Sequence, residues 1–287
     1  MIEISSGVLT AAINPFGAEL SSLRDAAGRE LMTDADPAFW TGRAPLLFPI
    51  VGRLMGDRYR LDGKGYPLPQ HGFARRQPFE RIEQAPHRAV FRLADNAATR
   101  AVYPFAFTLD AAFTLDGATL ATEVTVTNTG DAAMPASFGF HPAFAWPLPY
   151  GRAKTQHRIV FAADEPGGLS AIVLGGWMDA EPWPSPLDGR VLHLEDALFE
   201  RDALVWDPVA SRALRYDGGD GPALDIAFDM PSLGIWTKPG AHYVCIEPWH
   251  GIADPWGFEG EIWDKPGILR FEPGQARTFS MQVTLRP

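Results

Sequence analysis

The chain has 287 residues, of which 46% are hydrophobic and 21% are charged, and its formal net charge is −10. The length fits one large all-β domain or two average domains, and the composition is that of a globular rather than a disordered protein. A negative surface repels phosphate backbones, so nucleic acid is not expected as a partner.

Short apolar runs follow one another along the chain and predict β-strands. They are rich in Val, Ile, Leu, Thr and Phe, and they span residues 7–13, 18–23, 107–115, 118–128, 133–138, 223–228 and 242–246. Asp116-Gly117 predicts a tight hairpin turn, because glycine tolerates the positive φ that such turns need. The glycines between Asp217 and Gly221 indicate a second hairpin turn.

Helical signals are scarce, since 28 Gly and 26 Pro are scattered through the chain. We expect only single helical turns, at residues 36–40 and 196–202. There is no internal repeat and no linker, and no stretch approaches 18 consecutive apolar residues, so no membrane association is expected. The pattern predicts an all-β fold, with residues 1–287 forming a single large antiparallel β-sandwich whose loops carry the site.

Cys245 is the only cysteine, which excludes an intrachain disulfide and favours the reducing cytoplasm. Its apolar context, Tyr-Val-Cys-Ile, predicts a buried and inert thiol.

Three aromatic-rich segments contain the candidate chemical groups. They are residues 70–75 with His71, residues 138–142 with His141, and residues 246–250 with Glu247. Two imidazoles and one carboxylate are sufficient for proton transfer to and from oxygen near neutral pH. Each group also has a structural interpretation, in which the histidines hydrogen-bond loops and an arginine pairs with the carboxylate.

The local pattern places two of these groups on strand faces. If residues 136–140 form a strand, Ser137, Gly139 and His141 share one face, and Gly139 leaves room for a ligand beside the imidazole. Glu247 would share a face with Tyr243 and Cys245, and burial there would raise the pKa of its carboxyl group.

Other chemistries lack their motifs. The sequence has no GxSxG elbow, no HExxH pair, no phosphate-binding loop and no dinucleotide fingerprint, so neither a metal nor a cofactor is expected. Arg53 and Arg75 are further polar candidates, and the face of Trp249 could stack on the apolar side of a pyranose.

Four segments in order resemble the aldose 1-epimerases, or mutarotases, of the galactose mutarotase-like superfamily. The similarity is greatest to a divergent branch of lactose-operon-type proteins and relatives of hexose-6-phosphate epimerases. It covers nearly the whole chain and is carried by Leu47-Phe-Pro-Ile-Val-Gly-Arg53, Tyr66-Pro-Leu-Pro-Gln-His-Gly-Phe73, Phe138-Gly-Phe-His-Pro142 and Cys245-Ile-Glu-Pro-Trp249. It implies a twisted antiparallel β-supersandwich and interconversion of the α and β anomers of a hexose.

The resemblance also implies a role for each matching residue. Glu247 would take the proton from the anomeric hydroxyl while His141 protonates the ring oxygen. His71 would hydrogen-bond the sugar, and Arg53 matches the substrate-binding arginine. The family's substrate-binding aspartate has no clean counterpart, and Asp202 is the residue that we assign to it. The expected partner is a small sugar, and the expected state is a monomer or homodimer.

Two departures from the family pattern leave the substrate open. The glycine-asparagine-arginine run reads Val51-Gly52-Arg53 here, and His-Gly-Gly reads His71-Gly72-Phe73. Arg53 and Arg75 could instead bind a 6-phosphate, because a planar guanidinium suits that anion. The alternatives are therefore a hexose-6-phosphate 1-epimerase and a non-catalytic sugar-binding module.

Overall fold

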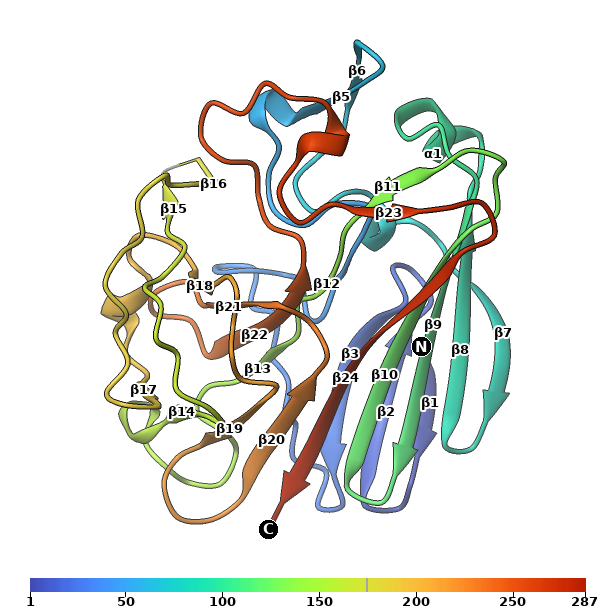
Figure 1. Cartoon of the computed structure of the whole chain (residues 1–287). Helices are drawn as coiled ribbons and strands as arrows, with labels where there is room; N and C mark the ends of the chain where they lie inside the picture. The colour runs from blue at the N-terminus through green and yellow to red at the C-terminus, as the bar shows by residue number, and fades with distance from the viewer. Residues whose placement is uncertain (174) are drawn as a thin grey trace.

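Two large antiparallel sheets dominate the computed structural model, which describes residues 1–173 and 175–287 (Figure 1). The nine-stranded sheet has the order β17-β14-β19-β20-β24-β10-β9-β8-β7. Its strands are β7 (Glu80–Ala85), β8 (Arg88–Ala94), β9 (Phe107–Asp116), β10 (Thr119–Asn128), β14 (Arg158–Phe161), β17 (Val191–His193), β19 (Ala213–Asp217), β20 (Ala223–Phe228) and β24 (Ala276–Arg286).

The second large sheet has the order β18-β21-β22-β12-β4, and β13 also pairs with β22. Its strands are β4 (Leu46–Leu47), β12 (Phe138–Phe140), β13 (Ala143–Ala145), β18 (Leu204–Trp206), β21 (Ser232–Trp236) and β22 (Tyr243–His250). The inner faces of the two sheets pack together. Phe138 of β12 stacks on Phe279 of β24, with ring centroids 5.0 Å apart. This packing makes a sandwich with an apolar interior.

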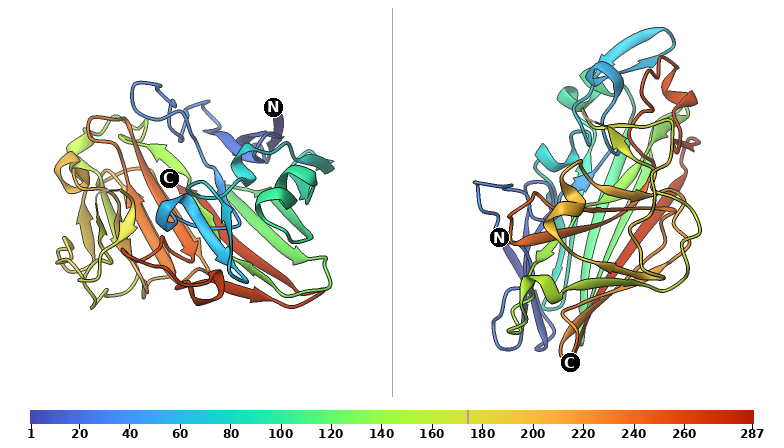
Figure 2. Two further views of the ribbon diagram at one scale, coloured as in Figure 1. Left: turned by 90° about the horizontal axis from the view of Figure 1, so that it is seen from above. Right: turned by 90° about the vertical axis from the view of Figure 1, so that its left-hand side faces the viewer.

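Smaller sheets and short helices surround the sandwich (Figure 2). A three-stranded sheet packs against β8 and β9, and three two-stranded pairs extend the loops. These strands are β1 (Ile2–Ser5), β2 (Leu9–Asn14), β3 (Glu19–Asp25), β5 (Arg58–Leu61), β6 (Lys64–Pro67), β11 (Met134–Ala136), β15 (Ile172–Val173), β16 (Trp177–Met178) and β23 (Leu269–Phe271). The described helices are α1 (Ala97–Val102) and the 3₁₀ helices η1 (Met55–Asp57), η2 (Ala74–Arg76), η3 (Lys154–Gln156), η4 (Asp196–Phe199) and η5 (Ile262–Asp264).

Most of the predicted strands are confirmed, including both hairpins. β9 and β10 pair across the predicted turn, where Gly117 has a φ of 52°. The turn between β19 and β20 contains Gly219 and Gly221, both with positive φ. The predicted helical turn at 36–40 is a single turn closed by a bond from the Trp40 amide to the Asp36 carbonyl. The turn predicted at 196–202 is shorter, because η4 ends at Phe199.

The strand predicted at residues 133–138 is wrong as one element. It is split into β11 and β12 at Ser137, whose amide donates to the carbonyl of Pro49 outside both strands. The space beside Gly139 is also not free for a ligand, because the indole of Trp249 fills it. A Cβ at Gly139 would lie 2.6 Å from Trp249 Cδ1.

Candidate active site

An interruption in the six-stranded sheet creates the site. On one side of β22, Trp249 and His250 pair with β12, while Tyr243, Val244 and Cys245 pair with β13. The link between β12 and β13, residues 141 and 142, therefore lies opposite the middle of β22. Pro248, which has no N–H to give to a ladder, falls beside this break.

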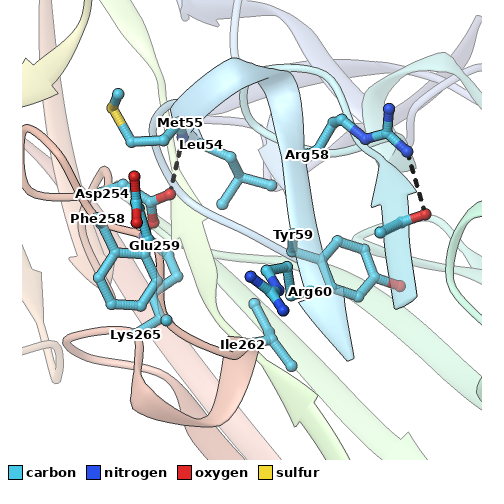
Figure 3. A pocket seen from close by; sticks show the side chains of 12 residues that line it. Leu54, Met55, Arg58, Tyr59, Arg60, Asp254, Phe258, Glu259, Ile262 and Lys265 are labelled. Atoms are coloured by element: carbon cyan, nitrogen blue, oxygen red, sulfur yellow. Dashed lines mark hydrogen bonds and ion pairs between the residues drawn. The ribbon is translucent and has the colours of Figure 1, made fainter. Parts of the chain in front are cut away.

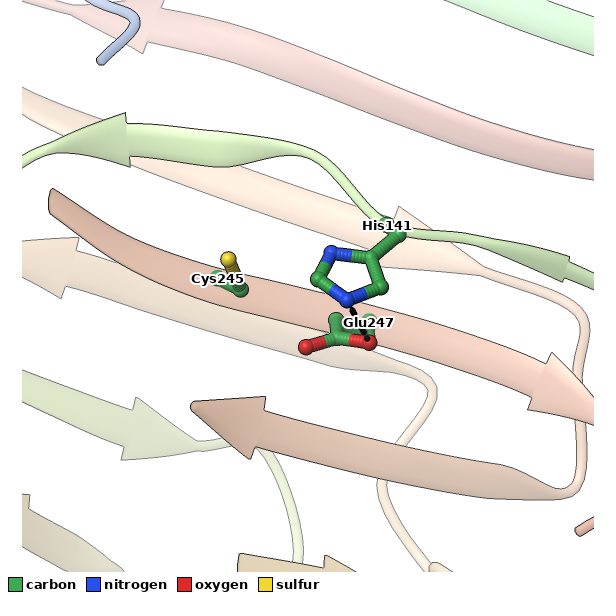
Figure 4. A group of neighbouring side chains, drawn as sticks. All are labelled: His141, Cys245 and Glu247. Carbon is green, nitrogen blue, oxygen red and sulfur yellow. Dashed lines mark ion pairs between the residues drawn. The ribbon is translucent and has the colours of Figure 1, made fainter. Parts of the chain in front are cut away.

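His141 and Glu247 meet at this interruption. His141 Nε2 lies 3.1 Å from Glu247 Oε2, and the imidazole stands directly over the carboxyl group (Figure 4). The two groups are nearly buried, with exposed fractions of 7% for His141 and 1% for Glu247. Burial, strengthened by the charge of Asp202, raises the pKa of Glu247 well above its ordinary value, and burial lowers the pKa of His141. The pair is thus suited to sharing one proton.

His71 reaches the same place from a loop with an unusual backbone. Its φ is 64°, a conformation that bonds to Gly52 stabilise. The His71 amide donates to the Gly52 carbonyl at 2.9 Å, and the Gly52 amide donates to His71 Nδ1 at 3.1 Å. Burial and the neighbouring His141 lower the pKa of His71, which favours the neutral ring. Because Nδ1 accepts from the Gly52 amide, the neutral ring carries its proton on Nε2. The two imidazoles lie edge to face, with centroids 5.6 Å apart.

The three groups line a cavity of about 410 Å³ with aromatic walls. Trp40, Trp236 and Trp249 contribute indole rings, and Trp40 lies over His141 at a centroid distance of 4.9 Å. A volume of this order suits a monosaccharide, and flat apolar faces suit the C–H side of a pyranose.

Asp202, which the resemblance assigns to substrate binding, also lines the cavity. It has a φ of 146°, and its Oδ1 accepts a hydrogen bond from the Ala203 amide at 2.7 Å. Burial raises the pKa of its carboxyl group. Asp202 and Glu247 therefore place two acids in one cavity, where the charge of Asp202 disfavours the ionisation of Glu247.

Comparisons with known proteins assign the chain to a family. The sequence model of the family described as aldose 1-epimerase matches residues 1–269. The chain is 30% identical over 295 residues to the chromosomal protein LacX of Lactococcus lactis, and the match covers 99% of both chains. The chain belongs to the aldose 1-epimerase family.

Solved structures extend this result to the fold. A galactose mutarotase related enzyme from Lactobacillus acidophilus has a TM-score of 0.92 at 31% identity, covering 100% of this chain and 97% of that one. A galactose mutarotase-like protein from Lactobacillus casei has a TM-score of 0.92 at 28% identity and covers all of both chains. The fold is the galactose mutarotase-like β-supersandwich that the sequence predicts. No helix in residues 1–173 and 175–287 has the length and apolarity to span a membrane.

Arg53, which matches the family's substrate-binding arginine, lies outside the lining of the cavity. Its guanidinium forms two bonds of 2.9 Å to the carboxylate of Asp57 and a third to the Gly175 carbonyl. Arg75 does line the cavity, and burial lowers its pKa to about 10, with the charge of Arg76 as the next cause. Arg53 is therefore not among the lining residues, and sugar binding by Arg53 stays a prediction.

Cys245 is free and buried, as predicted, and it completes a set of metal-ligand donor types with His141 and Glu247. The three donor atoms lie within 4.8 Å of one another. Burial, reinforced by Glu247, raises the pKa of the thiol well above its ordinary value, so the sulfur keeps its proton at neutral pH.

Several lining residues were missed by sequence reasoning. They include Trp40, Gln70, Arg76, Met178 and Ala253. Gln70 and Arg76 adjoin residues that the sequence singled out, so their position was a signal. Trp40 and Ala253 have no such neighbour, because only the folded chain brings their segments to the cavity.

Proposed function

We propose that the protein is an aldose 1-epimerase that interconverts the α and β anomers of a hexose. The 3.1 Å contact between His141 Nε2 and Glu247 Oε2 inside the cavity carries the proposal. The anomeric oxygen and the ring oxygen of a pyranose are bonded to the same carbon. An acid and a base that act on them together must therefore be close neighbours, as these two groups are.

The proposed reaction removes one proton from the anomeric hydroxyl of the sugar and adds one proton to its ring oxygen. Transfer of the shared proton to His141 leaves a carboxylate on Glu247 and an imidazolium beside it. The carboxylate accepts the proton of the anomeric hydroxyl, the imidazolium protonates the ring oxygen, and the bond between the anomeric carbon and the ring oxygen breaks. Rotation about the C1–C2 bond and the reverse transfers close the ring with the opposite configuration.

The surrounding residues support this reaction by holding the sugar. His71 presents an Nε2–H donor, Asp202 presents a carboxyl group, and Trp249 presents an apolar face. Each proton transfer contributes roughly 10²–10⁴-fold to the rate. The single cysteine leads us to propose the reducing cytoplasm as the compartment.

Polarimetry of freshly dissolved α-glucose and α-galactose tests the proposal. The protein is expected to accelerate the change in rotation, and Glu247→Gln is expected to lose most of this acceleration while still binding sugar, because an amide cannot accept the proton. Binding of sugar by the wild-type protein without acceleration would identify a sugar-binding module instead.

A hexose 6-phosphate is the second candidate substrate, and Arg75 and Arg76 favour it. Both line the cavity, and neither is a member of any ion pair in the described part of the chain. Arg75 Nη2 donates to the Gln70 carbonyl at 2.9 Å, whereas Arg75 Nε is buried without a hydrogen-bond partner there, so a bound anion would supply the missing acceptor. Arg53 does not suit this role, because Asp57 already occupies its guanidinium.

Anomer-exchange NMR on glucose 6-phosphate separates the two substrates. If the phosphate is recognised, Arg76→Gln is expected to slow exchange of the phosphorylated sugar and to leave the free sugar unaffected. Arg60→Gln, at an arginine outside this cavity, is the matched control. Equal effects of Arg76→Gln on both sugars would contradict phosphate recognition.

A further inference from the structure

A buried ion pair lies behind the cavity wall. Lys265 Nζ is 2.7 Å from Asp254 Oδ1 and donates a second bond of 2.7 Å to the carbonyl of Ile252. The side chains of Lys265 and Asp254 are 0% and 3% exposed. The pair borders a separate cavity of about 280 Å³, which Met55 and Phe258 also line (Figure 3). Buried ion pairs give little net stability to the folded state, but they can fix the relative positions of the segments that they join.

Asp254 connects segments that are distant in sequence. Its Oδ2 accepts a bond from the Met55 amide at 2.8 Å, drawn as a dashed line in Figure 3. Its own amide donates to the Arg53 carbonyl at 2.9 Å, and its carbonyl accepts from the Met178 amide at 2.9 Å. Asp254 thus hydrogen-bonds both the loop at residues 53–55 and Met178, which lines the cavity that contains His141 and Glu247.

The connection continues from this loop to His71. Ala253 packs so closely on Gly52 that a Cβ at Gly52 would lie 2.5 Å from the Cα of Ala253. Gly52 in turn makes both bonds to His71, one to its amide and one to Nδ1. The path from Lys265 to the imidazole therefore consists of direct contacts throughout.

We propose that the Asp254–Lys265 pair is a positioning device for His71. It holds the loop at residues 53–55, and with it Gly52, where the Gly52 amide fixes the orientation and the tautomer of the imidazole. The proposal rests on the aldose 1-epimerase function only for the predicted change in the kinetics of anomer exchange. Neither Asp254 nor Lys265 touches the sugar in this scheme, since both act through the backbone of the loop.

Two variants break the path at different points. Lys265→Met leaves the Asp254 carboxylate without its counter-charge. Met55→Pro keeps both charged groups of the ion pair and removes the amide that Asp254 holds, together with a side chain that lines the second cavity. Met55 is the first residue of η1, a position that accepts proline. Val126→Ala, a cavity-forming change in β10, controls for a general loss of stability.

The readouts are ¹⁵N NMR of histidine-labelled protein and the kinetics of anomer exchange. The His71 signals, assigned by comparison with His71→Asn, are expected to move from the Nε2–H tautomer toward a mixture in both path variants. The value of kcat/KM is expected to fall about tenfold or more in Lys265→Met, because small misplacements of a site residue are costly. Val126→Ala is expected to change neither.

The proposal is overturned if the path variants match Val126→Ala in both readouts. If Lys265→Met does not fold, Met55→Pro decides alone. If the wild-type protein does not catalyse anomer exchange, the proposed function fails, whereas the His71 signals still decide whether the pair positions the ring.

Discussion

At the scale of single residues, the burial of Glu247 has a consequence for stability. The pKa of Glu247 is raised above the ordinary 4.5 in the folded protein, so its carboxyl group ionises at a lower pH in the unfolded chain than in the folded one. The neutral carboxyl group therefore contributes stability that is fully present below about pH 4.5. This contribution is lost as the pH rises through the folded pKa. Glu247→Gln cannot ionise and avoids this loss.

Glu247→Gln is therefore expected to melt at a higher temperature than the wild-type protein near pH 7. The difference is expected to vanish at about pH 4, where both states of the wild-type protein carry a protonated carboxyl. Differential scanning calorimetry at the two pH values measures it. A lower melting temperature for the variant near neutral pH would mean that an ionised Glu247 stabilises the folded state.

Trp40 controls the surroundings of His141. Its ring lies over the imidazole and edge-on to Trp236, with a centroid separation of 5.8 Å from Trp236. Trp40→Ala admits water, so the pKa of His141 is expected to rise toward the ordinary 6.5 and kcat/KM to fall about tenfold. A pH–rate profile measures both effects. Trp256→Ala, at a residue 64% exposed and outside the cavity lining, is expected to behave like the wild-type protein.

At the scale of secondary-structure elements, β22 divides its side chains between two environments. Val244 and Ile246 belong to the central core, while Tyr243 and Cys245 belong to a small cluster beside Trp40 and Trp236. Glu247 and Trp249 continue the second face into the cavity. The alternation of a strand thus places the proposed base and the proposed stacking surface for the sugar on one side.

Two glycines on neighbouring strands leave the space that the indole of Trp249 occupies against the sheet. A Cβ at Gly234 of β21 would lie 2.5 Å from the indole, and a Cβ at Gly139 of β12 would lie 2.6 Å from it. Gly139→Ala is expected to push the indole into the cavity, raising KM severalfold and costing about 1–3 kcal/mol of stability. Anomer-exchange kinetics and urea unfolding measure these changes. Gly167→Ala, where the new Cβ meets nothing within 4 Å, should cause neither.

The elements differ in how far the sequence predicts them. β9, β10 and β20 follow from local pattern and turn chemistry, because hairpins depend on residues that are close in sequence. The break at Ser137 and the continuation of β22 through Pro248 depend on partners elsewhere in the chain. Local propensity does not contain that information, and tertiary pairing overrides it.

At the scale of the whole molecule, the site combines segments that are far apart in sequence. His71, His141 and Glu247 were identified because each stands in a distinctive aromatic context, and the structure brings them together. Trp40 was missed, and the pairing of Arg53 with Asp57 was not predicted, because that pair and the stacking of Trp40 exist only after folding. The types of residue in the sequence indicated proton-transfer chemistry, whereas the contacts between their side chains could be known only from the folded structure.

One core also connects these segments energetically. The largest apolar cluster extends from Ile4 to Val283, and the cavity walls come from segments between Trp40 and Ala253. Sugar bound in the cavity should therefore stabilise the entire structure against unfolding. At a sugar concentration about 100 times the dissociation constant, linkage adds about 2.7 kcal/mol.

Thermal unfolding monitored by calorimetry is accordingly expected to show a single transition that moves up by several degrees with sugar. Glu247→Gln should retain this shift, because it is expected to bind sugar without turning it over. Gly139→Ala should show a smaller shift at the same sugar concentration, since its displaced indole weakens binding. Two separate transitions, only one of them sensitive to sugar, would contradict the prediction that residues 1–287 form one domain.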